Sequence, residues 1–265
     1  MARSIRLLER YFFDCAADLE AGCALGRLRQ RGIAAERAML EQLGANTHRG
    51  AIFLGGLLLG AVHAAAARDS ATVSVAVADA ARRLFEAGLP AGTPGSEARA
   101  RYGAGGIIRE ALRGFPSVFE VGVPALRDAG QLGFDWRDGL FLAMARLMQT
   151  VEDTTALRRC GPAGVACLQR DGAKLETLLL DGGDPVVFLT DANRRYRLQR
   201  LTMGGVADLL AISIAWRLFG SLDRDPARSV GAWAGAREKS LILAEQYREP
   251  NPRTALSREP PSGWR

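Results

Sequence analysis

Aromatic residues make up only 7% of the 265 residues, and β-branched residues are sparse beside the abundant Ala and Leu. Aromatic and β-branched side chains favour strands, whereas Ala and Leu are strong helix formers. The composition therefore argues against a sheet-rich fold and predicts an all-α fold. Internal repeats and a domain-splitting linker are also missing. We expect a single helical domain over residues 1–248 and a disordered tail, rich in Pro, Arg and Ser, over residues 249–265.

Positive charge is present but not concentrated. The formal net charge is +6, yet the arginines are scattered and no run of five or six like charges occurs. An arm that binds nucleic acid would contain such a run, and a nucleic-acid-binding surface would interleave it with aromatic residues. We therefore expect no nucleic-acid partner. The basic balance fits a small polyanionic molecule instead.

Zinc-binding cysteine pairs and a secretory leader are missing as well. Seven residues separate Cys15 from Cys23 and six separate Cys160 from Cys167, which is wider than the spacing of the usual zinc pairs. We therefore expect reduced, buried thiols. Residues 1–20 place polar side chains within an apolar helical face and contain no cleavage-site pattern, so we expect a cytoplasmic protein.

The most informative stretch runs from Gly44 to Ala67, where a compact polar cluster leads into a long uncharged segment. Either Asn46 or Thr47 can cap a helix that begins there, and the first-turn N–H groups of a helix have no partner within it. The cluster also contains His48, Arg49 and Gly50. Cationic side chains and a closely approaching backbone at a helix N-terminus suit phosphate oxygens. The alternative is that these residues only cap and charge the start of the helix.

Residues 51–67 are apolar on every side of the predicted helix. Such a helix is either a membrane span or the central helix of an all-α core, and this length is borderline for spanning. Gly55, Gly56 and Gly60 allow close helix packing, no basic flank marks a membrane edge, and no second span follows. We therefore predict a helical bundle around this buried central helix, with no membrane partner.

Two carboxylates draw attention by their helical positions. Glu36 lies near the apolar face of a helix predicted over residues 23–43, although a solvated glutamate at the edge of that face is the alternative. Asp208 stands at the start of a strongly apolar helix that follows Gly204 and Gly205. The helix dipole favours an acid there, whether or not the acid has a further role.

Two adjacent acids, Glu152 and Asp153, stand at the C-terminal end of a helix predicted over residues 136–155. Acids at that end oppose the helix dipole, so a further interaction should stabilise them. A divalent metal ion or arginine partners would provide it. The alternative is a solvated acidic turn.

A Gly- and Pro-rich passage covers residues 88–116. Long loops in compact domains are often functional, although this passage could also be an ordinary loop. The polar residues that make it a candidate binding or catalytic segment include Arg101, Tyr102, Arg109 and Glu110. Its glycines at positions 103, 105 and 106 precede a predicted helix, as Gly44 and Gly50 do, but neither spacing matches the Walker or Rossmann fingerprint.

Taken in order, these motifs resemble the triphosphoribosyl-dephospho-coenzyme A synthase family, whose members serve citrate lyase and malonate decarboxylase. The matching blocks are Glu36 and Met39 leading to residues 46–53 (NTHRGAIF), Arg101–Gly103 with Glu110, Ala111 and residues 114–116 (GFP), residues 151–155 (VEDTT), and Gly204–Gly205 with residues 207–211 (ADLLA). They extend from about Ile33 to Leu218, and the NTHRGAIF and VEDTT blocks are the most specific.

The resemblance implies an all-α enzyme that takes ATP and 3′-dephospho-coenzyme A, releases adenine, and joins the triphosphoribosyl group to the ribose of dephospho-coenzyme A. The product would pass to a phosphoribosyl-dephospho-coenzyme A transferase and an acyl-carrier subunit. The Arg- and Ala-rich chain looks like the versions that serve malonate decarboxylase. Cleavage of an N-glycosidic bond has oxocarbenium-like character, so the site needs an acid, a base and cations on the triphosphate.

On this reading, each required role has candidates in the chain. Glu36 or Glu110 would be the catalytic base. Magnesium, brought with ATP, would be held by Glu152, Asp153 and Asp208. The substrate-binding residues would be Asn46, Thr47, His48, Arg49, Gly50, Arg101, Tyr102 and Arg109.

Three departures from the family's pattern keep other readings open. Relatives carry an upstream Pro-Lys-Pro-Gly-Leu-Val-like block, and we expect this chain to begin after it. Where the family reads Arg-Gly-Glu-Ala, residues 108–111 read IREA, which turns the arginine by about 100° around the helix axis. Residues 201–206 replace a Ser-Pro-Gly-Gly-Ser-like turn.

Two alternative functions follow from these departures. An enzyme with the same ATP site could use another acceptor. A degenerate or repurposed paralogue would bind nucleotide or a partner without turnover. For any of these functions, an apolar surface on the first helix, exposed where the upstream block is missing, would favour a homodimer.

Overall fold

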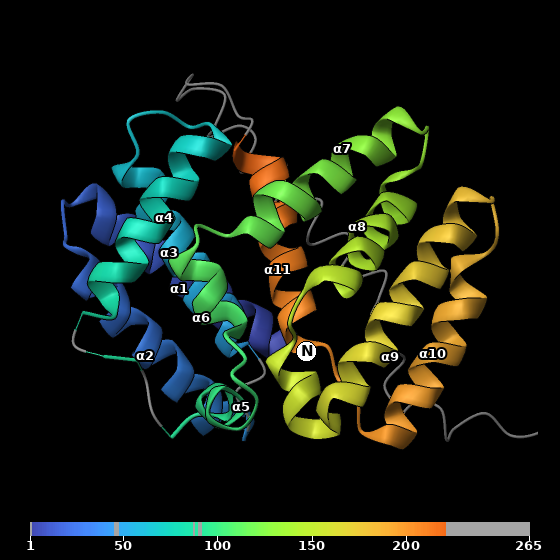
Figure 1. Ribbon diagram of the computed structural model, residues 1–265. Helices are drawn as coiled ribbons and strands as arrows, with labels where there is room; N and C mark the ends of the chain where they lie inside the picture. Colours follow the sequence, from blue (N-terminus) through green and yellow to red (C-terminus); the bar gives the residue numbers. More distant parts are fainter. Residues whose placement is uncertain (1, 45–47, 87, 90–91, 221–265) are drawn as a thin grey trace, which may run out of the picture. The chain divides into compact units, whose positions relative to one another are not determined.

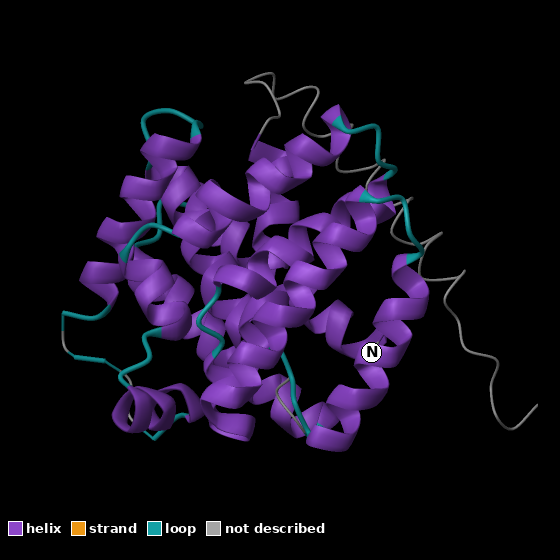
Figure 2. Cartoon of the chain, turned by 45° about the vertical axis from the view of Figure 1, so that its right-hand side comes forward, coloured by secondary structure: helices purple, strands orange, loops and turns teal. Residues whose placement is uncertain are grey.

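Every regular element in the described part of the chain is a helix, as the ribbon and the cartoon show (Figure 1 and Figure 2). The computed structural model describes residues 2–44, 48–86, 88–89 and 92–220. The all-α prediction is therefore confirmed for these residues. The helices are α1 (Ala2–Glu20), α2 (Leu25–Leu43), α3 (Arg49–Ala64), α4 (Ser70–Leu84), α5 (Pro94–Tyr102), α6 (Gly106–Leu112), α7 (Val123–Gln131), α8 (Trp136–Thr150), α9 (Thr154–Leu180), α10 (Pro185–Gln199) and α11 (Gly204–Ala215), with two π-helical segments, η1 (Ser117–Gly122) and η2 (Trp216–Gly220).

α11 lies between two groups of helices. In Figure 1 it runs, in orange, between the group α1–α6 and the group α7–α10. Its packing partners include α3 from the first group and α8 and α9 from the second. The sequence of α11, GGVADLLAISIA, is apolar almost throughout, and Leu209 and Ile212 are buried. A helix that is apolar on every side is stable only when neighbours surround it, and this explains the position of α11.

α3 is the buried helix that the sequence predicts around residues 51–67. Its glycines allow α1 to approach closely, since a Cβ on Gly55 would lie 2.5 Å from the Phe12 ring. Next to it, the Tyr11 hydroxyl donates a hydrogen bond to the carbonyl of Ile52 at 3.0 Å. The predicted close helix packing is therefore confirmed. None of the helices formed by the described residues combines the length and apolar character needed to cross a membrane.

The helix predicted over residues 136–155 is wrong at its C-terminal end. α8 ends at Thr150, and α9 begins at Thr154 after three non-helical residues. Asp153 is the N-cap of α9, with an extended backbone at φ −74° and ψ 103°. An acid at an N-terminus is favoured by the helix dipole and by capping, so Asp153 does not oppose a dipole as predicted.

The Gly- and Pro-rich passage contains more helix than the sequence indicated. Besides α6, the helix predicted after the glycines, it holds α5, which begins with a capping box. In this box the Thr93 hydroxyl accepts from the Ser96 N–H at 3.1 Å, and the Ser96 hydroxyl accepts from the Thr93 N–H at 2.9 Å.

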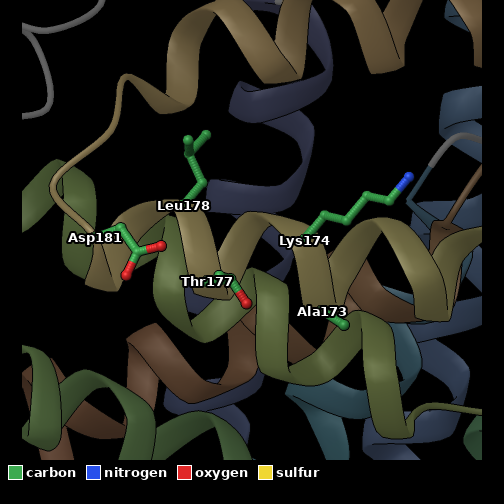
Figure 3. A pocket seen from close by; sticks show the side chains of 5 residues that line it. All are labelled: Ala173, Lys174, Thr177, Leu178 and Asp181. Atoms are coloured by element: carbon green, nitrogen blue, oxygen red, sulfur yellow. The ribbon is translucent and has the colours of Figure 1, made fainter.

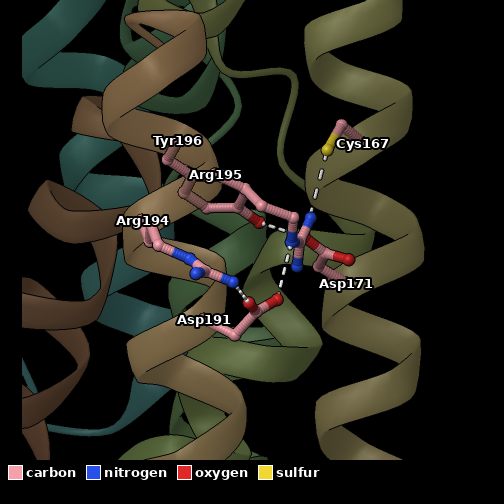
Figure 4. A network of polar contacts seen from close by, with 6 residues as sticks. All are labelled: Cys167, Asp171, Asp191, Arg194, Arg195 and Tyr196. Carbon is pink, nitrogen blue, oxygen red and sulfur yellow. Dashed lines mark hydrogen bonds and ion pairs between the residues drawn. The ribbon is translucent and has the colours of Figure 1, made fainter.

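A polar network fixes α10 against α9 (Figure 4). Asp171 of α9 is 4% exposed, and it accepts from Arg195 Nη1 at 3.0 Å and from the Tyr196 hydroxyl at 2.8 Å. Asp191 accepts from Nε of the same arginine at 3.0 Å. Burial, with the Asp171 carboxylate second, raises the pKa of Tyr196, so its hydroxyl remains a donor. These partners satisfy the buried charge, which would otherwise strongly destabilise the fold.

Several predictions concern residues that the structure does not describe. They include capping by Asn46 or Thr47, the domain boundary at residue 248 and the tail after it. All four cysteines are free, as predicted, but the predicted burial holds only for Cys15, because the other three are half-buried.

Candidate active site

Asp153 joins the first turns of α9 and α11. Its Oδ1 accepts from the backbone N–H groups of Thr155 at 2.8 Å and Ala156 at 3.0 Å, both in α9. Its Oδ2 accepts from the N–H of Val206 in α11 at 3.0 Å. The side chain is 0% exposed, and three charge-assisted hydrogen bonds compensate for burial of its charge.

Asp208 extends from α11 to the N-terminus of α3. The backbone N–H of Ala51 donates to its carboxylate, and Gly50 makes the approach possible. A Cβ on Gly50 would lie 1.7 Å from Asp208 Oδ2. Burial, with the negative charge of Asp153 second, raises the pKa of Asp208 from its usual 3.8 to about 7, while the Ala51 N–H opposes the shift. Carboxyls with such shifts are typical of functional sites.

The N-terminus of α3 also carries an ion pair. Arg49 Nε donates to Glu36 Oε2 at 2.8 Å, and the arginine side chain is 52% exposed. His48 precedes it as the N-cap residue, and partial burial lowers the pKa of its imidazole. The structure thus brings Glu36, Arg49 and Gly50 to the same helix end as Asp208. Cationic side chains and backbone donors at a helix N-terminus are groups that suit an anion.

We expect Gly50→Ala to lower both stability and activity, because the new methyl group would displace the Asp208 carboxylate. Overpacking of this kind costs about 1–3 kcal/mol, which urea denaturation would measure. Gly130→Ala in α7 is the matched control, since a Cβ at Gly130 meets nothing within 4 Å. Alanine favours the helix there by about 1 kcal/mol at most. Wild-type stability of the Gly50 variant would contradict the close approach of Asp208.

Glu152 faces away from its neighbour Asp153, toward residues 103–106, which we call the glycine turn. Its Oε2 accepts from the N–H of Gly105 at 2.8 Å and pairs with Arg109 Nη1 at 3.1 Å. Arg109 Nη2 donates to the carbonyl of Gly103 at 2.9 Å. The structure therefore places the predicted metal ligand Glu152 and the predicted substrate-binding residue Arg109 in one ion pair.

Arg101 and Tyr102 lie at the end of α5, immediately before the glycine turn. The Arg101 guanidinium lies 5.2 Å from the centre of the Tyr102 ring, a cation–π contact, and its side chain is exposed. α5 packs against α9, and a Cβ at Gly161 of α9 would lie 3.7 Å from the Tyr102 hydroxyl. These two side chains therefore lie beside the N-terminal part of α9, the helix that Asp153 caps.

Glu110 has partners in its own segment. Its two carboxylate oxygens accept from the Ser117 hydroxyl at 2.6 Å and from the Ser117 N–H at 3.1 Å. Burial raises the pKa of Glu110, although the Ser117 bonds oppose the shift. These contacts anchor the start of η1. Sequence reasoning missed Ser117, which directly follows the GFP block.

The three predicted metal ligands do not form one cluster. Among the described residues, no group of three or more His, Cys, Asp or Glu side chains is placed to hold a metal ion. Glu152 is engaged by the glycine turn, whereas Asp153 and Asp208 are neighbours. Two carboxylates fit magnesium when substrate phosphates and water supply the other oxygens, as is usual for this ion. Of the three, only Asp153 and Asp208 lie together, and both oxygens of the fully buried Asp153 already accept backbone N–H groups.

A shallow hollow on α9 lies elsewhere (Figure 3). It is lined by Ala173, Lys174, Thr177, Leu178 and Asp181. All five residues belong to the part of α9 that follows a kink at Gly161, whereas Asp153 caps the part before the kink. One face of a single helix offers no opposing wall for a nucleotide, so the candidate site remains the end where α3, α9 and α11 begin.

Comparisons with known proteins agree with the motif order. A family model described as ATP:dephospho-CoA triphosphoribosyl transferase matches residues 1–226. A probable 2-(5''-triphosphoribosyl)-3'-dephosphocoenzyme-A synthase of Pseudomonas aeruginosa (strain UCBPP-PA14) is 37% identical over 220 residues, which are 80% of this chain and 71% of the relative. The protein of the same name from Pectobacterium carotovorum subsp. carotovorum (strain PC1) is 33% identical over 222 residues, 79% of this chain and 72% of its own. No solved structure matches the chain.

Proposed function

The chain belongs to the ATP:dephospho-CoA triphosphoribosyl transferase family, and we propose that it forms 2′-(5″-triphosphoribosyl)-3′-dephospho-coenzyme A from ATP and 3′-dephospho-coenzyme A, with release of adenine. Nothing in the comparisons favours a degenerate paralogue. The observation that carries the assignment of the site is the neighbouring Asp153 and Asp208, held at the N-termini of α3, α9 and α11. Each of these residues lies in or beside a block that resembles the family.

The reaction exchanges one bond at the ribose of ATP. The bond between the anomeric carbon and adenine breaks, and its electron pair leaves with the base. The 2′-hydroxyl oxygen of dephospho-coenzyme A bonds to the same carbon, and its proton balances the charge on adenine. Positive charge develops on the sugar in between, so the site must place a base near the hydroxyl and cations near the triphosphate.

Arg49 and the first-turn N–H groups of α3 would bind phosphate oxygens. Arg49 is exposed enough to contact a ligand while it stays near Glu36. Arg101 and Tyr102 would contact the nucleotide from the end of α5. Asp153 and Asp208 would hold the magnesium ion that accompanies ATP, which would neutralise charge on the triphosphate.

Glu36 is the better placed of the two predicted bases, since it lies at the same helix end as Arg49 and Asp208, whereas Glu110 is bonded to Ser117. We expect Glu36→Gln to lower the rate of adenine formation about 100-fold, because glutamine accepts no proton. Glu41→Gln, an exposed change in α2, should leave the rate unchanged. Equal rates for wild type and Glu36→Gln would remove Glu36 as the base.

The product would serve as precursor for the prosthetic group of an acyl-carrier subunit, delivered by a phosphoribosyl-dephospho-coenzyme A transferase. We also propose a cytoplasmic protein that can form a homodimer through α1, where Ile5 and Phe13 are exposed. Sedimentation of the purified chain would test the dimer.

Adenine release tests the proposed function directly. Purified protein would be incubated with magnesium, ATP and dephospho-coenzyme A, each omitted in turn, and the products separated by chromatography. Adenine that forms only in the complete mixture, in equal amount to the coupled product, is the expected result. Binding of ATP without adenine formation would contradict the proposal.

A further inference from the structure

We propose that Glu152 is a positioning residue that holds the glycine turn, residues 103–106, against the start of α9, and that it is not a metal ligand. The expected change in enzyme kinetics rests on the proposed function. The expected opening of the turn can be measured without substrate.

Three contacts join the turn and Arg109 to residues 152–154, at the start of α9, and a fourth joins Arg109 to the turn. One oxygen of Glu152 binds both the N–H of Gly105 and the guanidinium of Arg109, at 2.8 and 3.1 Å. Arg109 in turn donates to the carbonyl of Gly103 at 2.9 Å. Gly106 completes the contact, because a Cβ there would lie 2.5 Å from the Thr154 side chain. Glu152 and Arg109 thus bind both ends of the turn.

The backbone of the turn depends on these contacts. Gly103 and Gly106 have φ of +67° and +51°, the left-handed region that favours glycine. Glycines gain more conformational freedom on release than other residues. A charged side chain that accepts a backbone hydrogen bond across 47 residues of sequence is therefore an effective restraint on the turn.

The geometry also separates Glu152 from the neighbouring Asp153 and Asp208. Asp153 is fully buried and directed to the first turns of α9 and α11, whereas the Glu152 side chain is 42% exposed and directed to the turn. A cation bound between Asp153 and Asp208 would leave the contacts of Glu152 intact. Loss of Glu152 should therefore affect the residues that the turn positions, Arg101 and Tyr102, and not the affinity for magnesium.

Glu152→Ala, Glu152→Gln and Arg109→Ala test the proposal, with Asp79→Ala as the control. Asp79 is an exposed acid on α4 that pairs with the exposed Arg82. Its replacement therefore also removes an acid from an arginine ion pair, but one that does not contact the glycine turn. The KM for ATP and kcat would be measured at saturating dephospho-coenzyme A, together with the magnesium concentration that gives half-maximal activity. Trypsin cleavage after Arg101 would be followed by mass spectrometry, relative to cleavage after the exposed Arg137.

We expect Glu152→Ala and Arg109→Ala each to raise the KM for ATP about tenfold, with kcat and the magnesium requirement unchanged. Cleavage after Arg101 should accelerate by a similar factor, because the turn opens more often. Glu152→Gln keeps an acceptor for Gly105 and should show about a threefold effect. A variant that carries both Glu152→Ala and Arg109→Ala should show the same KM and the same cleavage rate as either single variant, because the two side chains act as one unit.

Two results would overturn the proposal. A shifted magnesium requirement with unchanged cleavage after Arg101 would assign Glu152 to the metal. Unchanged KM and unchanged cleavage would show that the turn does not depend on Glu152. If the wild-type protein forms no adenine, the proposed function fails, yet cleavage after Arg101 still decides whether Glu152 holds the turn.

Discussion

Replacing Asp153 with alanine is expected to lower the free energy of unfolding by about 3–5 kcal/mol, more than any other single change considered. The substitution leaves two buried N–H groups, those of Ala156 and Val206, and the part-buried N–H of Thr155 without their acceptor. Each unsatisfied group costs about 1–3 kcal/mol. Loss of the Asp153 charge also removes its repulsion of the Asp208 carboxylate, which partly offsets this cost. The offset is small, because burial, and not Asp153, is the first cause of the raised pKa of Asp208.

Asp69→Ala is the matched control. Asp69 is also an aspartate N-cap, accepting from the Thr72 N–H at 2.9 Å, but it is exposed and caps α4 alone. Loss of an exposed cap costs about 1 kcal/mol. Urea denaturation of both variants, followed by circular dichroism, measures the difference. Equal destabilisation by the two substitutions would show that Asp153 is an ordinary cap and does not join α9 to α11.

The apolar pattern predicted the helices better than their ends. α3 is correctly predicted because its composition is apolar on every side, which only a buried helix tolerates. The break at residues 151–153 was missed because the stripe of Leu140, Met144, Leu147 and Val151 continues through it. The missed signal is the aspartate before Thr154 and Thr155, a typical N-cap position, which the resemblance had marked only as a motif.

The residue types of the candidate site were predictable, but their partners were not. Glu36 and Arg49 are 13 residues apart and meet because α2 turns back on α3 at Gly44, whose φ is +69°. Asp153 and Asp208 come together only through the packing of α9 on α11. Adjacent residues can also diverge: Glu152 and Asp153 were assigned one role, yet an extended backbone directs them to opposite sides. Such distinctions need tertiary packing.

The same packing explains why two carboxylates that disfavour each other's charge stay together. Helix N-termini supply N–H donors to both carboxylates, three to Asp153 and that of Ala51 to Asp208. The residual cost stays on Asp208, whose pKa is raised. Natural sites keep such a cost where a ligand removes it, and a cation bound to ATP would do so here.

Asp208→Asn is expected to stabilise the ligand-free protein at pH 8 by about 2–4 kcal/mol and to lower the rate of adenine formation about 1000-fold. The folded protein holds the Asp208 proton up to about pH 7, whereas the unfolded chain loses it near 3.8. The folded state therefore binds more protons between these two values, and wild-type stability falls as the pH rises through this window. Asparagine keeps an acceptor for the Ala51 N–H and carries no charge. The titration of this position therefore does not lower the stability of the variant as the pH rises.

Melting temperatures of the two proteins, measured without magnesium or nucleotide from pH 4 to pH 8, test the expectation. The advantage of the variant should be smallest near pH 4, grow up to about pH 7, and stay constant above it, because both states of wild type are then ionised at Asp208. The rate of adenine formation should fall about 1000-fold at every pH, since the asparagine amide cannot replace a carboxylate beside magnesium and triphosphate. An advantage that is independent of pH would mean that Asp208 titrates in the folded protein as it does in the unfolded chain, and would remove the argument that its burial is compensated by ligand binding.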